Sequence, residues 1–187
     1  MAPEQPVFYY DLGEPECYLV GERVMSELAV APEWEPVLAR DLGLTASAGE
    51  PSGLRERVAE QGLQPLRWPA GWPPDTELAM LAATYAKHIG RAVAYSMAAF
   101  RQAFAGGRDL GQEGTVLIAG AACEMHPTAL LKGISLRSVN TALAQAGARA
   151  RDAGVDALPA LAVDADVFTG PGCVEAANRA LAGLPAR

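Results

Sequence analysis

The chain has 187 residues, enough for one domain with a substantial hydrophobic core. Half of the residues are hydrophobic and 20% are charged, so the composition is that of a globular protein and excludes intrinsic disorder. The net charge is -7 and no cluster of Lys and Arg stands out, which argues against a nucleic acid or an anionic membrane surface as partner.

The first part of the chain predicts a strand, a helix and a second strand. Residues 7–10 are apolar and aromatic, which is typical of a buried strand. Pro15 suits the first turn of a helix that we expect to run to about residue 31. The second strand is predicted at 34–39, and Pro36 favours an edge position for it. A loop rich in Gly, Ser and Pro follows at 41–53, and then a short helix at 54–61.

The second part predicts mostly helices. After a proline-rich linker at 68–74, Asp75 or Thr76 can cap a helix whose apolar residues recur on one face. Helical patterns continue to about residue 152. Strands return at 160–163 and 167–168, and a last helix is expected at 171–181. We therefore predict one α/β domain over residues 1–187, with a mixed sheet of order β-α-β then β-β-α and a helical insertion at about 75–152.

Three cysteines bear on the cellular location: Cys17, Cys123 and Cys173. Such an odd and widely spaced set is typical of free thiols in a reducing compartment and not of a disulfide framework. The start of the chain has no basic segment followed by an apolar stretch, and the apolar runs are far too short to span a membrane. We expect a cytoplasmic protein without a signal peptide or a membrane-spanning segment.

Most common types of site have no support in the sequence. No glycine-rich loop has the spacing that cradles a phosphate, so no nucleotide is expected. His88 and His126 lie far apart in the sequence and near no pair of cysteines, so no metal site is expected, and His88 is interpreted as a surface residue of a helix. A serine-hydrolase motif is also missing.

The remaining candidate is the turn Glu14-Pro15-Glu16-Cys17, where the first strand leads into the first helix. A helix N-terminus favours an anion such as a thiolate, and Cys17 lies within the first turn. The two glutamates act in the opposite direction, because a like charge disfavours the thiolate. Glu14 is near the N-cap, where its carboxylate could also occupy the unpaired N–H groups. The sequence leaves open which influence prevails.

The whole chain resembles the thioredoxin-fold group that contains the DsbA-like disulfide oxidoreductases. Within this group it is most similar to the 2-hydroxychromene-2-carboxylate isomerases and the kappa-class glutathione transferases. The resemblance is carried by four stretches in chain order: Phe8-Tyr9-Tyr10-Asp11 with Pro15 and Tyr18-Leu19, Trp34 with Pro36-Val37-Leu38, residues 72–110, and residues 154–168 with Leu158-Pro159. It implies a thioredoxin-like fold with a cis peptide bond before Pro159.

The resemblance also implies a site at the turn before the first helix. Oxidoreductases of the group carry a Cys-x-x-Cys pair there, and the isomerase branch has a serine at the first position that holds the thiol of bound glutathione. Here Glu14 occupies the first position and Cys17 the second. Residues 169–174 are uncharged, whereas isomerase-like members have an acidic and a basic residue there that help to anchor glutathione.

These features lead to one functional prediction and its alternatives. We predict a thiol- or glutathione-dependent enzyme, isomerase- or transferase-like, with Glu14 and Cys17 as catalytic residues. Tyr18 and the backbone of Leu158 before Pro159 are expected to bind the substrate. Its partners would be a small-molecule substrate or a low-molecular-weight thiol, without metal or nucleotide, and a homodimer is compatible with the resemblance. The alternatives are an oxidoreductase-like protein or redox sensor acting through Cys17 alone, and a non-catalytic binding protein.

Overall fold

The computed structural model describes residues 5–45 and 50–183. Part of the loop predicted at 41–53 and the first four residues of the chain therefore lie outside the described residues. The described strands form one four-stranded mixed sheet in the order β2-β1-β3-β4, in which β1 pairs in parallel with β2 and antiparallel with β3, and β3 pairs antiparallel with β4. The bounds of the strands are β1 Val7–Tyr10, β2 Glu33–Pro36, β3 Ala160–Val163 and β4 Asp166–Thr169. The mixed sheet predicted from the sequence is confirmed.

The central strand β1 explains why the sheet is buried on both faces. Its side chains alternate, so that Phe8 and Tyr10 enter the larger hydrophobic core while Tyr9 enters a smaller one on the other face. Phe8 and Tyr10 both contact Trp34 of β2 in edge-to-face geometry, with ring centroids 4.9 and 5.2 Å apart. The aromatic residues of the first strand thus build the core that holds β2 against β1.

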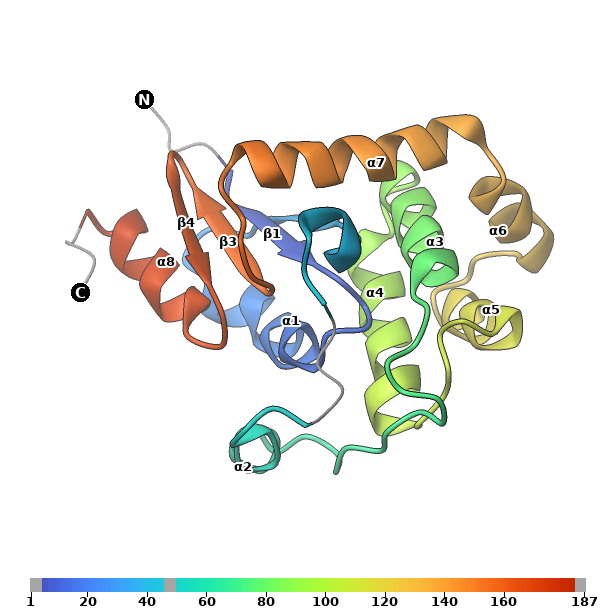
Figure 1. Cartoon of the computed structure of the whole chain (residues 1–187), viewed down its shortest axis with the longest axis horizontal. Coiled ribbons are helices and arrows are strands. Elements are labelled where there is room, and N and C mark those ends of the chain that lie inside the picture. The colour runs from blue at the N-terminus through green and yellow to red at the C-terminus, as the bar shows by residue number, and fades with distance from the viewer. Residues whose placement is uncertain (1–4, 46–49, 184–187) are drawn as a thin grey trace.

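The helices account for most of the remaining chain. In Figure 1, α3 to α6 lie to one side of the sheet, α8 lies at its opposite end, and α7 runs along both parts. The described helices have these bounds: α1 Pro15–Glu27, a 3-10 turn η1 Ala39–Leu42, α2 Leu54–Glu60, α3 Glu77–His88, α4 Ala92–Phe100, a π-helical turn η2 Arg101–Ala105, α5 Glu113–Ala122, α6 Pro127–Ile134, α7 Arg137–Asp152 and α8 Cys173–Leu181.

Two elements end earlier than the sequence predicted, and each ends at a tertiary contact. Helix α1 stops at Glu27 instead of residue 31, because the side chain of Asn178 donates to the carbonyl oxygen of Glu27 and accepts from the N–H of Ala29. Strand β2 stops at Pro36 instead of residue 39. The chain then turns into η1, where the N–H of Ala39 donates a hydrogen bond to the carboxylate of Asp11. Distant partners therefore decide both boundaries.

Helix α3 begins where the sequence predicted, and its start matters for the site. The carboxylate of Asp75 accepts a hydrogen bond of 3.1 Å from the N–H of Glu77, so that Asp75, and not the side chain of Thr76, satisfies a free donor of the first turn. The peptide bonds Trp72–Pro73 and Leu158–Pro159 are cis.

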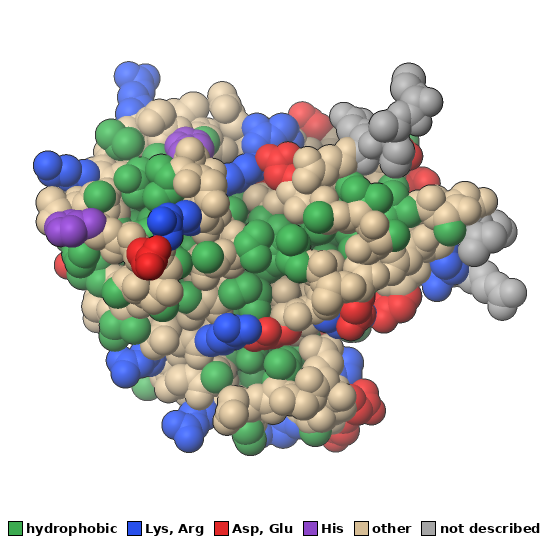
Figure 2. Space-filling model, turned by 180° about the vertical axis from the view of Figure 1, so that it is seen from behind, with side chains coloured by type: hydrophobic (Ala, Val, Ile, Leu, Met, Phe, Trp, Pro, Cys, Tyr) green, Lys and Arg blue, Asp and Glu red, His purple; other side chains and the backbone are tan. Residues whose placement is uncertain are grey.

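Hydrophobic side chains also reach the surface. Seen from behind, they form several patches with Lys, Arg, Asp and Glu side chains between and around them (Figure 2). The large hydrophobic side chains that are exposed in the described part of the chain are Met25, Ile89, Ile118 and Leu136. No helix within residues 5–45 and 50–183 is long and apolar enough to cross a membrane.

Candidate functional site

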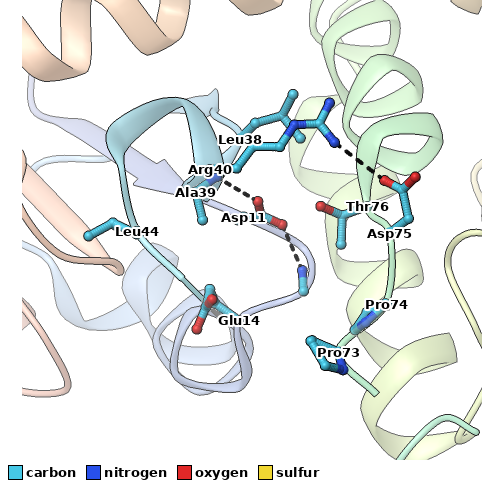
Figure 3. A pocket seen from close by; sticks show the side chains of 11 residues that line it. Asp11, Glu14, Leu38, Ala39, Arg40, Leu44, Pro73, Pro74, Asp75 and Thr76 are labelled. Atoms are coloured by element: carbon cyan, nitrogen blue, oxygen red, sulfur yellow. Dashed lines mark hydrogen bonds and ion pairs between the residues drawn. The ribbon is translucent and has the colours of Figure 1, made fainter. Parts of the chain in front are cut away.

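A pocket of about 330 Å³ lies where the end of β1, the η1 turn and the start of α3 meet. Figure 3 shows it from close by. Its volume is at the lower end of the range of known small-molecule sites. The described residues that line it are Asp11, Gly13, Glu14, Leu38, Ala39, Arg40, Leu44, Pro73, Pro74, Asp75 and Thr76.

The buried carboxylate of Asp11 holds the three segments of the pocket together. Only 4% of Asp11 is exposed. One of its oxygens accepts from the N–H of Gly13 at 2.8 Å, the other accepts from the N–H of Ala39 at 2.9 Å, and the hydroxyl of Thr76 also bonds to it. Burial raises the pKa of Asp11, and these hydrogen bonds oppose the rise. Asp11 therefore links the loop after β1 to η1 and to the start of α3.

Gly13 lies at a close approach between two of these segments. A Cβ atom at this position would come within 2.7 Å of the Cγ2 atom of Thr76. Because real Cβ atoms essentially never come this close, a larger residue would force the Thr76 side chain or the start of α3 to shift. The glycine thus lets the two walls of the pocket approach one another.

Glu14 places a carboxyl group with a raised pKa in the pocket. It is the N-cap residue of α1 with an extended backbone, but its side chain makes no capping hydrogen bond. The carboxyl group instead lines the pocket. Burial, and then the negative charges of Asp11 and Glu16, raise the pKa of Glu14 to about 7. Near neutral pH this carboxyl can therefore both accept and donate a proton.

Arg40 is the cation among the described lining residues, and other carboxylates already engage it. Its guanidinium group donates to Glu77 at 2.6 Å and lies 3.6 Å from Asp75. In Figure 3 it points towards Asp75 and away from Glu14. The positive charge of Arg40 thus stabilises the start of α3 and is directed away from the carboxyl of Glu14.

The structure places Cys17 inside the core. Its side chain has no exposed surface. Burial raises the pKa of the Cys17 thiol well above its ordinary value; a hydrogen bond with the Asp11 backbone opposes this, and the charges of Glu14 and Asp11 add to it. The question that the sequence left open is thus decided by burial, because desolvation of the thiolate outweighs the helix N-terminus.

The start of α8 brings a second thiol towards the same part of the core. Cys173 belongs to the same hydrophobic cluster as Cys17, is fully buried, and adds to the rise of the Cys17 pKa. Burial raises the pKa of Cys173 itself to about 12. Both cysteines are free thiols in the structure. Neither thiol is ionised or accessible near neutral pH.

The other predicted binding residues lie outside the pocket. Tyr18 is 2% exposed, and its ring stacks on Phe104 at a centroid distance of 5.7 Å, so it belongs to the aromatic core. Leu158 is half-buried and packs against both cores, and the carbonyl oxygen of Pro159 accepts a hydrogen bond from Gly170. Of the five predicted site residues, Glu14 is the one that lines this pocket.

Several lining residues escaped the sequence analysis because they come from three separate segments. Asp11 was named only within the first stretch of the resemblance and not as a site residue, although a carboxylate that directly follows a buried strand is itself a signal of a hydrogen-bonded polar centre. Arg40 and Thr76 carry no such local signal. Glu16, which the sequence placed next to the thiol as a free charge, forms an ion pair with Arg57. Within the described residues, no group of three or more His, Cys, Asp or Glu could hold a metal ion.

Comparison with solved structures identifies the fold. A 2-hydroxychromene-2-carboxylate isomerase is similar over 96% of this chain and 95% of its own, with a TM-score of 0.81 and 15% sequence identity. A probable DsbA oxidoreductase from Streptomyces coelicolor is similar over 96% of this chain and 88% of its own, with a TM-score of 0.72 and 17% identity. The chain has a DsbA-like thioredoxin fold. No protein-family model matches it, and no curated protein is similar in sequence.

The DsbA-like thioredoxin fold is the fold that the resemblance implied, and this prediction is confirmed. In it, the pocket with Glu14 lies where the sheet part meets the helical insertion, at the N-terminal end of α1. At 15 to 17% identity the likeness extends to the fold alone, so the chemistry of the site must be argued from its own residues.

Proposed function

We propose that the chain is a thiol-dependent enzyme, isomerase- or transferase-like, in which Glu14 is the acid/base residue. The thiol would be glutathione or another low-molecular-weight thiol. The observation that carries the proposal is the Glu14 carboxyl group, which lines a ligand-sized pocket at the N-terminus of α1, forms no cap, and has a pKa of about 7. The fold shared with a 2-hydroxychromene-2-carboxylate isomerase supports it.

The proposed chemistry follows from matched pKa values. An ordinary thiol has a pKa of about 8.5, so moving its proton to a carboxylate of pKa about 7 costs roughly 2 kcal/mol. The positive end of the α1 dipole favours the thiolate that forms. As the sulfur bonds to the β-carbon of an α,β-unsaturated carbonyl, the carbon–carbon π bond breaks, its electron pair moves to the carbonyl oxygen as an enolate, and the thiol proton passes to Glu14. In an addition, Glu14 then returns this proton to the α-carbon of the enolate. In an isomerase, the C–C single bond rotates, the electron pair re-forms the double bond as the C–S bond breaks, and the proton returns to the sulfur.

A binding and turnover experiment tests this proposal. We expect glutathione or 2-mercaptoethanol to raise the melting temperature, and the protein to accelerate addition of the thiol to an α,β-unsaturated ketone. Glu14→Gln should lower that rate by about 10²-fold or more, since one general acid or base contributes roughly this factor. Glu56→Gln is a matched control, because Glu56 is an exposed glutamate on α2. The absence of both stabilisation and acceleration would contradict the proposal.

The alternative of catalysis or redox sensing through Cys17 has less support, because the thiol is fully buried with a raised pKa. We expect Cys17 of the native protein to remain unmodified by iodoacetamide at pH 8 while the unfolded chain is alkylated completely. Peptide mass spectrometry measures this directly. Alkylation of native Cys17 at the rate of an unfolded cysteine would favour a monothiol mechanism instead.

The other alternative is a non-catalytic binding protein. Stabilisation by thiols without any turnover would favour it.

A further inference from the structure

The charges around the pocket are unevenly distributed. Of the described lining residues, Asp11, Glu14 and Asp75 carry carboxylates and Arg40 carries the guanidinium. That guanidinium is 2.6 Å from Glu77 and 3.6 Å from Asp75, so its charge is compensated at the far end of the pocket. A ligand near Glu14 therefore meets negative charge that Arg40 does not balance.

The groups that face Glu14 from neighbouring segments have the same sign. Asp11, at the end of β1, and Glu16, on the first turn of α1, both raise the pKa of Glu14. Arg57 of α2 is paired with Glu16, so these two charges largely compensate each other and Asp11 is the main negative neighbour of Glu14. Below pH 7 Glu14 is mostly protonated and neutral, whereas above pH 7 it is mostly a carboxylate and presents a negative charge to a ligand in the pocket. An anionic group placed there would be repelled, and a cationic group would be attracted.

The rest of the lining suits a short alkyl chain. Leu38 and Leu44 from the β2–η1 side, and Pro73 and Pro74 before α3, form apolar walls on either side of the polar centre. In Figure 3 the two prolines and Leu44 flank the position of Glu14. The volume of about 330 Å³ accommodates a small molecule with one polar end and a few methylene groups.

From this charge pattern and these walls we propose that the pocket selects thiols that carry an ammonium group, which pairs with Glu14, and rejects anionic thiols. The inference rests on the proposed thiol-dependent function and specifies its ligand class as a small aminothiol. The ammonium group replaces the cation that the described lining lacks next to Glu14, and the alkyl chain lies against the proline and leucine walls. Glutathione, which has two carboxylates and one ammonium group, is a poorer match than a simple aminothiol.

Three small thiols that differ mainly in charge test the proposal. We expect calorimetry at pH 8 and low ionic strength to rank cysteamine first, 2-mercaptoethanol second and 3-mercaptopropionate last. This gap, the ratio of the dissociation constants of 2-mercaptoethanol and cysteamine, should be about tenfold. An attraction of this size is expected between opposite charges roughly 5 Å apart, in a dielectric between those of protein and water. Glu14→Gln should close this gap, whereas Glu56→Gln should leave it unchanged. Added salt should also narrow it.

Proton linkage gives an independent readout. An ammonium group next to Glu14 lowers the pKa of this carboxyl, and it also lowers the pKa of the thiol in the same molecule, so the two groups remain matched for proton transfer. Cysteamine should therefore release protons on binding at pH 7, and Glu14→Gln should abolish the release. Tighter binding of 3-mercaptopropionate or glutathione than of cysteamine would overturn the inference and leave the thiol-dependent function intact. Equal affinity for all three thiols would also overturn it. Failure of every thiol to bind would instead contradict the proposed function itself.

Discussion

Glu14 shows how one side chain can be kept available for chemistry at a helix start. Carboxylates near a helix N-terminus usually gain from its unpaired N–H groups and from the dipole, which lowers their pKa. The Glu14 side chain makes no such hydrogen bond, and burial next to Asp11 and Glu16 raises its pKa to about 7. The folded protein therefore binds a proton at Glu14 that the unfolded chain releases at about its ordinary pKa of 4.5.

This proton makes the stability of the protein depend on pH. Because the folded state holds more protons at Glu14 than the unfolded state between about pH 4.5 and 7, the free energy of unfolding falls as pH rises through that window and stays lower above it. We expect Glu14 to contribute a loss of about 1–2 kcal/mol, a value reduced for its partial exposure. Glu14→Gln should remove this loss, so the variant should be more stable than the wild type at pH 8 and about equally stable at pH 4.5.

Urea denaturation at both pH values measures the effect. Asp11 also has a raised pKa and is present in both proteins, so the difference between variant and wild type reports Glu14 together with its interaction with Asp11. Glu56→Gln is expected to show no comparable change, because its side chain is exposed. If the difference in free energy of unfolding between Glu14→Gln and the wild type is the same at pH 8 and at pH 4.5, the pKa of the Glu14 carboxyl is not raised in the folded protein.

At the scale of the elements, one buried hydrogen bond joins the sheet to the helical insertion. The hydroxyl groups of Tyr10 on β1 and Ser96 on α4 are 2.6 Å apart, and both residues are fully buried. Tyr10 also packs against Phe100 of α4 at a ring-centroid distance of 6.0 Å. The bond therefore connects the strand that leads into the Glu14 turn with the helix that covers it.

Removing both hydroxyl groups should cost less than the sum of the two single removals. We expect Tyr10→Phe to lower the free energy of unfolding by about 1–3 kcal/mol, because the Ser96 hydroxyl is left buried without its partner. Ser96→Ala should have an effect of similar size for the same reason. The double variant should be less destabilised than the sum of the two single variants. Urea denaturation of the four proteins completes this cycle, and strictly additive effects would indicate that the hydroxyl groups do not interact.

At the scale of the whole molecule, the surface bears on assembly. Ile89, Ile118 and Leu136 lie on or between helices of the insertion, and their side chains are between 41% and 48% exposed. Hydrophobic side chains exposed on a protein surface can contribute to contacts with another protein chain. Together with the resemblance noted in the sequence, they lead us to expect a homodimer.

Light scattering after size exclusion tests this expectation. The mass should be twice the 19.5 kDa of the chain over a wide range of protein concentrations. Ile118→Lys should shift the mass towards that of one chain if α5 belongs to the contact, whereas Arg108→Ala, outside the helices, serves as a control that leaves the mass unchanged. A mass of 19.5 kDa at every concentration would contradict a dimer.

The sequence predicted the fold of this protein better than its candidate site. The strand at 7–10, the helical insertion and the hairpin near the end were predicted correctly, because hydrophobic periodicity and Gly/Pro punctuation are local properties. The ends of α1 and β2 were misplaced, since they depend on Asn178 and Asp11, which contact them from other segments. Boundaries set by tertiary hydrogen bonds leave no trace in a local pattern.

For the candidate site, the sequence by itself indicated one residue that lines the pocket: Glu14, at the junction of the first strand and the first helix. Whether its neighbour Cys17 was reactive depended on which face of α1 enters the core, and only the tertiary structure decided this, by enclosing the thiol completely. The other residues of the pocket were decided in the same way, because Thr76 and Arg40 reach the pocket through the packing of α3 and η1 against the end of β1. Patterns along the chain fix the elements, whereas burial and charge proximity arise only when distant elements meet.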